Sequence, residues 1–89
     1  MFVSLSDIAK DALAKCKSRG WSRSWLHAGC YLHLEVSEFV ESIRGKSGVP
    51  EQEAADILFV LLSTMEENSV DINATIKCLN KLKEDNADE

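Results

Sequence analysis

Residues 54–62 restrict the fold of this chain more than any other segment. They read AADILFVLL, which is apolar on nearly every side of a helix, and Asp56 is the one charged residue among them. A helix that is apolar all round is expected at the centre of a helical domain. A lone carboxylate there is costly unless it is paired, protonated or bound to a metal ion. The segment therefore predicts a central buried helix that carries a functional acid.

Four helices are expected in total, because breakers separate four segments with helical periodicity. No segment alternates with the two-residue period of a β-strand, which favours an all-α fold. The chain is expected to form one domain over residues 1–89, with a frayed tail from about residue 84. The expected boundaries are Ser6 and Gly20 for the first helix, Ser22 or Ser24 and Gly45 for the second, Pro50 and about Glu67 for the third, and Asp71 for the start of the fourth.

The apolar content of the chain predicts that it assembles. A chain of 89 residues buries only about 60–65% of its unfolded surface and is marginal as a monomer, yet 45% of its residues are hydrophobic. We therefore expect a four-helix bundle that completes its core by dimerisation. The faces expected to be buried are Ile8, Ala12, Leu13 and Cys16 in the first helix and Ile72, Ile76, Leu79 and Leu82 in the fourth.

Charge and cysteine content exclude several classes of function. The formal net charge of −5 disfavours binding to nucleic acid or to anionic membranes. The longest apolar run, residues 57–62, is too short to span a bilayer, and the N-terminus lacks the pattern of a secretion signal. Cys16, Cys30 and Cys78 are odd in number and widely spaced, which predicts reduced thiols in the cytoplasm and small core residues.

Four acids form two pairs, Glu35 with Glu38 and Glu53 with Asp56, and each pair has a spacing of three residues. Side chains at this spacing share a helix face, so both acids of a pair can reach one point. A helical wheel places the first pair at the margin of the apolar arc of the second helix. That arc consists of Trp25, Leu32, Val36 and Ile43.

A divalent cation is the expected partner of these acids. No Lys or Arg occurs within residues 24–43 or 47–76, so few cations are available locally. Several carboxylates together select a hard ion, which predicts Mg²⁺, with Mn²⁺ as the alternative. Zinc is disfavoured because His27, Cys30 and His33 spread over about 120° of helix surface without a fourth ligand. No glutamate is followed three residues later by histidine, as a ferritin-like di-iron site requires.

The pattern Glu-x-x-Glu, a spacer of fourteen residues and Glu-x-x-Asp resembles the MazG-like superfamily of all-α nucleoside-triphosphate pyrophosphohydrolases. It is carried by LHLEVSEFVESIRGK and EQEAADILFVLL, and the resemblance extends over residues 25–83. It implies hydrolysis between the α- and β-phosphates to a nucleoside monophosphate and pyrophosphate, in nucleotide-pool housekeeping. It also implies a MazG-like bundle that assembles as a homodimer or homotetramer. The residues implied to bind Mg²⁺, one of them also orienting or deprotonating the attacking water, are Glu35, Glu38, Glu53 and Asp56.

One position departs from the family pattern, and the C-terminal segment resembles it without a fixed alignment register. Leu34 stands where many relatives have an acid directly before the first glutamate. The family often ends with a basic, asparagine-containing segment that contacts phosphates. The candidates here are Asn80, Lys81, Lys83 and Asn86, and a solvated helix surface is the alternative for the lysines.

Residues around the start of the second helix are the candidates for contact with the base. Trp21, Trp25 and His27 can stack on or hydrogen-bond a nucleobase, although tryptophans near a helix start also complete cores or oligomer contacts. Tyr31 is expected either to line the pocket or to pack in the core. Arg23 is expected either to reach a phosphate or to lie in solvent.

Two other functions fit parts of the pattern. The segment EAADILF followed by a fourth helix also resembles phosphoribosyl-ATP pyrophosphohydrolase, although HLEVSE lacks the basic, glutamate-rich approach usual in that branch. A non-enzymatic helical dimerisation module would use the acids only to line a solvated groove. Pyrophosphate release from a nucleotide separates the enzymes from this module.

Overall fold

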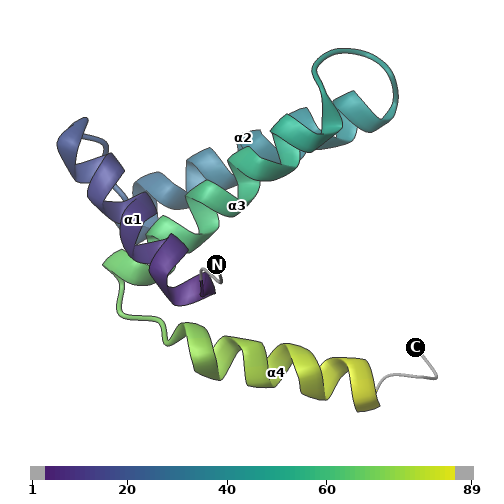
Figure 1. Cartoon of the computed structure of the whole chain (residues 1–89). Helices are drawn as coiled ribbons and strands as arrows, with labels where there is room; N and C mark the ends of the chain where they lie inside the picture. Colours follow the sequence, from purple (N-terminus) through teal and green to yellow (C-terminus); the bar gives the residue numbers. More distant parts are fainter. Residues whose placement is uncertain (1–3, 86–89) are drawn as a thin grey trace.

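The computed structural model describes residues 4–85, which form four α-helices and no β-strand (Figure 1). The prediction of an all-α fold with four helices is therefore confirmed. Of the tail predicted to fray, residues 84 and 85 are the last of the fourth helix, and residues 86–89 lie outside the described part. The helices are α1 (Leu5–Ser18), α2 (Trp25–Ile43), α3 (Pro50–Glu67) and α4 (Ile72–Asp85).

Side-chain caps explain where α1 and α4 begin. Asp71 precedes α4 as predicted, and its Oδ1 accepts a hydrogen bond from the Ala74 N–H at 3.0 Å. The prediction for α1 is wrong by two residues, because Ser4 and not Ser6 is the cap. The Ser4 Oγ accepts a hydrogen bond from the Asp7 N–H at 3.1 Å, which satisfies one of the N–H groups that a first helical turn leaves free.

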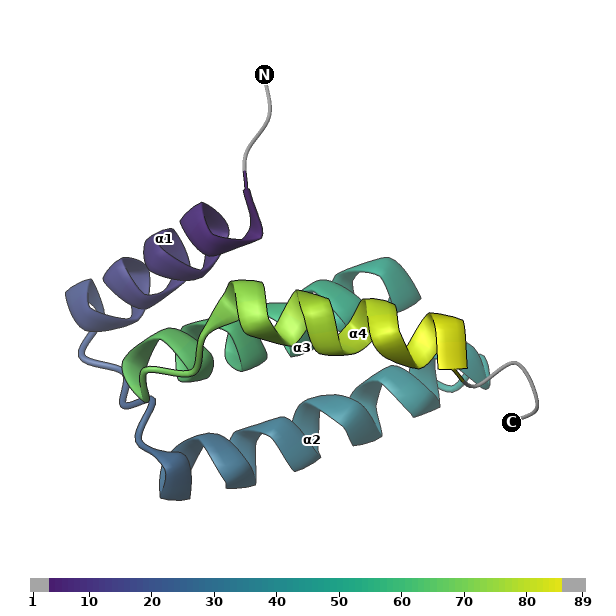
Figure 2. The ribbon, with the colours of Figure 1, turned by 90° about the horizontal axis from the view of Figure 1, so that it is seen from below.

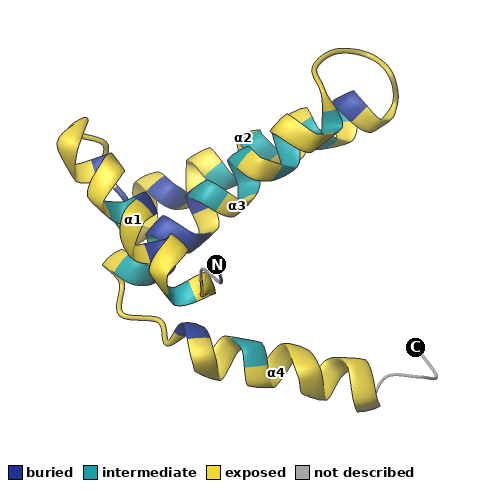
Figure 3. Cartoon of the chain, viewed as in Figure 1, coloured by how far each residue is buried: buried dark blue, intermediate teal, exposed yellow. Residues whose placement is uncertain are grey.

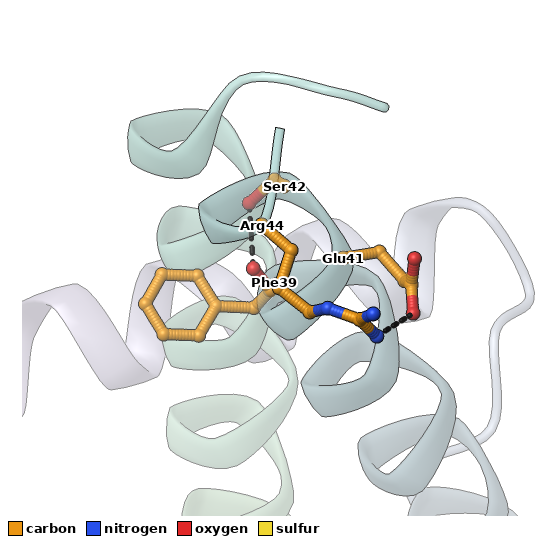
Figure 4. Close-up of polar contacts among 4 residues, drawn as sticks. All are labelled: Phe39, Glu41, Ser42 and Arg44. Atoms are coloured by element: carbon orange, nitrogen blue, oxygen red, sulfur yellow. Dashed lines mark hydrogen bonds and ion pairs between the residues drawn. The ribbon is translucent and has the colours of Figure 1, made fainter. Parts of the chain in front are cut away.

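The connection between α2 and α3 turns at glycine and proline, as predicted. Gly45 follows α2 with a φ of 75°, a left-handed conformation that ends a helix, and Pro50 opens α3. In the last turn of α2 the Ser42 Oγ donates a hydrogen bond to the carbonyl three residues earlier, at 2.6 Å (Figure 4). Arg44 Nη1 lies 3.4 Å from Glu41 Oε1 in the same turn.

Helix α3 lies between α1 and α2. Helices α2 and α3 run antiparallel and side by side, and α1 packs against α3 as well (Figures 1 and 2). Helix α3 therefore has the central position predicted for it, although Leu58 and Leu61 on its surface are exposed. Helix α4 points away from the α2–α3 pair, so in the described residues of a single chain it does not close a four-helix bundle (Figure 1).

A small core forms where α1, α3 and α4 meet. Its buried members are Ala9, Leu62, Met65 and Ile72, and Ile76 packs against them. This cluster attaches α4 to the rest of the molecule through the first turns of the helix alone.

The apolar faces predicted for α1 and α4 are buried only in part (Figure 3). In α1, Ala12 and Cys16 are buried, whereas Ile8 is 41% exposed. In α4, Leu79 and Leu82 are more than half exposed because the helix leaves the core after its second turn.

The cysteines are free thiols, and the expectation that all three are core residues is wrong for two of them. Cys16 is buried, whereas Cys30 and Cys78 are exposed in the single chain.

The chain exposes more surface than a compact protein of its mass. Its accessible surface is 6727 Å², whereas about 5,200 Å² is expected for a folded monomer of this size. Large apolar side chains on α2 and α3 belong to this exposed surface, and Trp25 is the most exposed of them at 75%. A single chain therefore leaves apolar surface uncovered.

Candidate functional site

Glu35 lies on the inward face of α2, in the seam between α2 and α3. Because α3 is the helix that packs along α2, the buried and half-buried stripe of α2 faces α3. Glu35 is at the centre of that stripe. Its members follow one another at spacings of three and four residues and are Ala28, Leu32, Glu35, Phe39 and Ser42.

The buried arc predicted for α2 is therefore wrong. Trp25, Val36 and Ile43 are 75%, 45% and 61% exposed, and of that arc Leu32 alone is half-buried. Glu35 does not lie at the margin of the buried stripe but inside it. The most apolar side of α2 faces outward, and the side that carries an acid and a serine faces α3.

Glu53 and Asp56 belong to the face of α3 that is turned toward α2. Asp56 lines the same cavity as Glu35, and a residue two turns later, Ser63, accepts a hydrogen bond from Arg23, which precedes α2. The seam thus combines one acid of the first pair with both acids of the second. The inward positions of α3 are Glu53, Asp56, Val60 and Ser63.

A cavity of about 590 Å³ opens where the α1–α2 connection meets the seam. Its walls come from that connection, from the first half of α2 and from α3, with Arg23 and Phe59 among the lining residues. It combines flat aromatic surfaces and an imidazole with two acids. The predicted site residues that line it together are Trp21, His27, Tyr31, Glu35 and Asp56.

The other predicted site residues do not line this cavity. Glu38 is exposed on α2, Trp25 is largely exposed at the start of α2, and Glu53 is half-buried near the start of α3. Helix α4 supplies no lining residue in the single chain. Its phosphate-contact candidates Asn80, Lys81 and Lys83 are exposed, and Asn86 lies outside the described residues.

Glu35 interacts electrostatically with all three other acids. Burial raises the pKa of its carboxyl above the usual value, and the charges of Glu38, Asp56 and Glu53 raise it further. Arg23 lowers this pKa but does not reverse the rise. A proton or a cation at this point of the seam would relieve the repulsion among the carboxylates.

The two acids of α3 differ in their surroundings. The Asp56 Oδ1 accepts a hydrogen bond from Gln52 Nε2 at 3.0 Å. The Glu53 Oε2 is shielded from solvent and has no hydrogen-bond partner among the described residues. Gly48, at a φ of 81°, passes close to this carboxyl, and a Cβ on Gly48 would lie 3.4 Å from the Glu53 Cδ. A buried acceptor without a donor is a position where a cation or an ordered water is expected.

The acids fit a hard cation in their chemistry but are not arranged around one. Their donor atoms are carboxylate oxygens, the ligands that Mg²⁺ and Mn²⁺ prefer. The unsatisfied Glu53 Oε2 is consistent with that use. Within residues 4–85, however, no three Asp, Glu, His or Cys side chains are placed to hold one ion. Binding of a metal therefore requires side-chain movement from this arrangement.

The burial of Arg23 and its hydrogen-bond partners were not predicted from the sequence. The alternative that it lies in solvent is wrong, because it is 7% exposed. Its Nε donates to Ser63 Oγ at 2.9 Å, and its carbonyl accepts from Asn68 Nδ2 at 3.0 Å. The signal in the sequence is Ser63, a hydroxyl on the inward face of an apolar helix, but nothing local indicates its partner.

His27 is oriented by serines before α2. Its Nδ1 is 3.1 Å from Ser24 Oγ and 3.2 Å from Ser22 Oγ. Ser24 occupies the cap position of α2, one of the two positions predicted. On the same side of the cavity, Trp21 is about half exposed, and the Arg19 guanidinium lies 5.6 Å from its ring. The cavity therefore has an ordered imidazole and an accessible indole.

Comparison with protein-family models, with curated proteins and with solved structures finds no match to this chain. Among the described residues, no helix combines the length and the apolar character that crossing a lipid bilayer requires.

Proposed function

We propose that this chain is a Mg²⁺-dependent, MazG-like nucleoside-triphosphate pyrophosphohydrolase that cleaves its substrate between the α- and β-phosphates. The observation that carries the proposal is one cavity that is lined both by acids from two helices, Glu35 and Asp56, and by aromatic and imidazole side chains. A nucleotide has a charged phosphate chain, which acids can bind through Mg²⁺, and a flat base, which aromatic side chains can stack on. The volume of about 590 Å³ is in the range of small-ligand pockets.

The four acids have complementary roles in this proposal. Mg²⁺ bound by Glu35, Glu38, Glu53 and Asp56 would neutralise phosphate charge and lower the pKa of the attacking water. Glu35, which lines the cavity together with Asp56, would accept the proton of that water as the general base. Asp56, whose Oδ1 accepts a hydrogen bond from Gln52 Nε2, would orient the reacting groups.

The base contacts come from the α1–α2 connection and from the first half of α2. Trp21 and Tyr31 offer ring surfaces on which a base stacks. His27 is held through Nδ1 by two serine hydroxyls, which leaves Nε2 to hydrogen-bond the base. Helix α4, with its exposed lysines, is a second source of phosphate contacts when another chain brings it near the cavity.

We propose further that the chain functions as a homodimer, with the homotetramer as the alternative, through what we call the outer face. The outer face lies on the side of the α2–α3 pair opposite the cavity, about 80° around α2 from the seam by helical geometry. A second copy is the natural occupant because the chain exposes more surface than a compact monomer. The outer face consists of Trp25, Val36, Val40 and Ile43 of α2 and Leu61 of α3.

The test is pyrophosphate release by the purified protein with Mg²⁺. The panel contains the canonical ribo- and deoxyribonucleoside triphosphates, modified pyrimidine and purine triphosphates, and phosphoribosyl-ATP. We expect Mg²⁺-dependent release from at least one nucleoside triphosphate. Release from phosphoribosyl-ATP alone would assign the chain to the histidine-pathway reaction instead.

The non-enzymatic alternative is distinguished by two results together. No release from any nucleotide, combined with no rise in melting temperature on addition of Mg²⁺, would refute the enzyme proposal and leave a helical dimerisation module. Glu53→Gln and Glu51→Gln form a matched pair of variants on α3. Glu53 belongs to the seam, whereas Glu51 is exposed, so we expect only the first variant to lose activity.

A further inference from the structure

Arg23 is a buried cation that lacks a charged partner. It is 7% exposed, and the ion pair found in the described residues joins Arg44 to Glu41 at the far end of α2. Within residues 4–85 no carboxylate is at ion-pair distance from Arg23. An arginine stays ionised in proteins, so burial of its charge is costly without an anion nearby.

The hydrogen bonds of Arg23 fix its guanidinium and leave donors free. Nε donates to Ser63 Oγ at 2.9 Å and Nη1 donates to the Ser22 carbonyl at 3.1 Å, and both acceptors are uncharged. Nη2 has no acceptor among the described residues. The rings of Tyr31 and Phe59 lie 5.7 Å and 5.9 Å from the guanidinium carbon. The group is therefore ordered before any ligand arrives.

Arg23 lines the same cavity as the acids without neutralising them. Glu35 and Asp56 contribute to the cavity wall together with Arg23. The pKa of Glu35 is raised in spite of Arg23, because burial and the three other acids outweigh it. The cavity thus contains two carboxylates and a guanidinium that form no ion pair with one another among the described residues.

We propose that Arg23 is the anion-binding group of this cavity and that it contacts a phosphate of the ligand through its free guanidinium N–H groups. A guanidinium suits this task because its planar donors match two oxygens of one phosphate. The identity of the ligand as a nucleoside triphosphate rests on the proposed function, whereas the anion site itself does not. The inference can therefore be tested with an inorganic anion.

The probe is inorganic tripolyphosphate in the presence of Mg²⁺, with binding measured by isothermal titration calorimetry. We expect Arg23→Gln to weaken binding by more than about tenfold, since it removes charge-assisted hydrogen bonds between the guanidinium and phosphate oxygens. Arg23→Lys keeps the charge but loses the planar pair of N–H donors, so we expect an affinity between those of the wild type and Arg23→Gln. Arg44→Gln removes one positive charge from the opposite end of α2 and should bind tripolyphosphate like the wild type. Equal affinity of Arg23→Gln and wild type would overturn the inference.

Two further measurements separate ligand binding from folding. Ser63→Ala removes an anchor of the guanidinium but keeps its charge. It should therefore lower the melting temperature, and it should weaken tripolyphosphate binding by less than Arg23→Gln does. In the wild type, side-chain ¹⁵N resonances of Arg23 should shift when tripolyphosphate is added to the Mg²⁺-loaded protein and not with Mg²⁺ alone. Absence of a tripolyphosphate-dependent shift overturns the inference even if every Arg23 variant unfolds.

The two proposals fail in different ways. If no nucleotide is hydrolysed but tripolyphosphate binds through Arg23, the anion site stands and the enzyme proposal falls. If Arg23→Gln hydrolyses a nucleoside triphosphate with unchanged KM and kcat, the enzyme proposal stands and the role of Arg23 falls.

Discussion

The seam between α2 and α3 holds ionisable and hydroxyl side chains, whereas the outer face of the same two helices holds large apolar ones. Glu35, Asp56 and Ser63 are half-buried or buried in the seam, and Trp25 and Ile43 are exposed outside. Stability of a single chain favours the reverse arrangement, because buried apolar area contributes about 25 cal/mol per Å² and unpaired buried charge is unfavourable. This difference supports the two proposals made above, in which a polar ligand binds in the seam and a second copy of the chain covers the outer face.

The largest effect should come from Asp56→Asn, which tests whether the seam is a catalytic site. The substitution keeps the size of the side chain and removes the charge of an acid that lines the cavity. We expect loss of all measurable Mg²⁺-dependent pyrophosphate release, with helical content by circular dichroism unchanged. Glu51→Gln, at an exposed position of the same helix, should keep full activity. Normal turnover by Asp56→Asn would show that the seam is not where the chemistry occurs.

Glu35→Gln should lower kcat by about 10²–10⁴-fold, the contribution of a general base, while it stabilises the metal-free protein. The pKa of Glu35 is raised in the folded state by burial and then by its acidic neighbours, so the folded state holds this proton more tightly than the unfolded state. The stability contribution of Glu35 is therefore most favourable below the unfolded pKa of about 4.3 and decreases as the pH rises through the folded pKa.

The measurement for Glu35 is the melting temperature of wild type and Glu35→Gln in EDTA as a function of pH. At neutral pH the variant should melt higher, and the difference should vanish in acid. A variant that melts lower at neutral pH would mean that the Glu35 charge is satisfied in the folded chain. Glu41→Gln, whose acid pairs with Arg44 at the end of α2, is the control.

Ile43→Glu tests the other side of the comparison. An acid within a protein interface is unfavourable because it is buried without a partner, so we expect the dimer dissociation constant to rise more than about tenfold, which corresponds to 1.4 kcal/mol. Analytical ultracentrifugation measures this dissociation constant. Ser37→Glu adds the same charge at an exposed α2 position that does not belong to the outer face and should leave assembly unchanged. Identical sedimentation of both variants and wild type would remove the outer face as the interface.

The smallest effect should come from Ser63→Ala, which removes the acceptor of the Arg23 hydrogen bond. We expect a loss of about 1.5 kcal/mol in the free energy of unfolding, the lower end of the range for a hydrogen bond to a charged group. Thr64→Val is the matched control, because the Thr64 hydroxyl bonds only to the Val60 carbonyl of its own helix in the described residues. If urea denaturation gives equal losses for the two variants, the bond to Arg23 contributes nothing to stability.

The helix boundaries were predictable because the signals that set them are local. Asp71 caps the turn that follows it, Pro50 has the backbone angle of a first helical residue, and Gly45 has the left-handed φ that ends α2. Ser6 was wrong because Ser4, another serine two residues earlier, was available for the same role. Such errors change a boundary without changing the fold.

The buried faces were less predictable, because hydrophobicity shows which residues avoid water but not what covers them. In α2 the apolar arc with Val36 and Ile43 was expected inside and is outside, while Glu35 is inside. In α4 the expected stripe is covered only at Ile72 and Ile76. An apolar stripe buried by another part of the same chain has the same sequence pattern as one left for a partner.

Part of the candidate site followed from the sequence and part required the three-dimensional arrangement. The spacing of the acids and the aromatic residues before α2 indicated residues that do meet in one cavity, such as Trp21 and Asp56. The bond between Arg23 and Ser63 joins residues forty positions apart, and no periodic pattern links them. A long-range polar pair of this kind is visible only once the helices are placed.

The thin attachment of α4 has a consequence for hydrogen exchange. Beyond Ile76 this helix has no buried side chain in the described residues, so its local opening costs little free energy. In a monomer its amide protons beyond the second turn should exchange with solvent deuterium well before those of α3. Protection of these amides at higher protein concentration would show that Leu79 and Leu82 become covered, so the exchange rate of one helix measures the fraction of protein that is assembled.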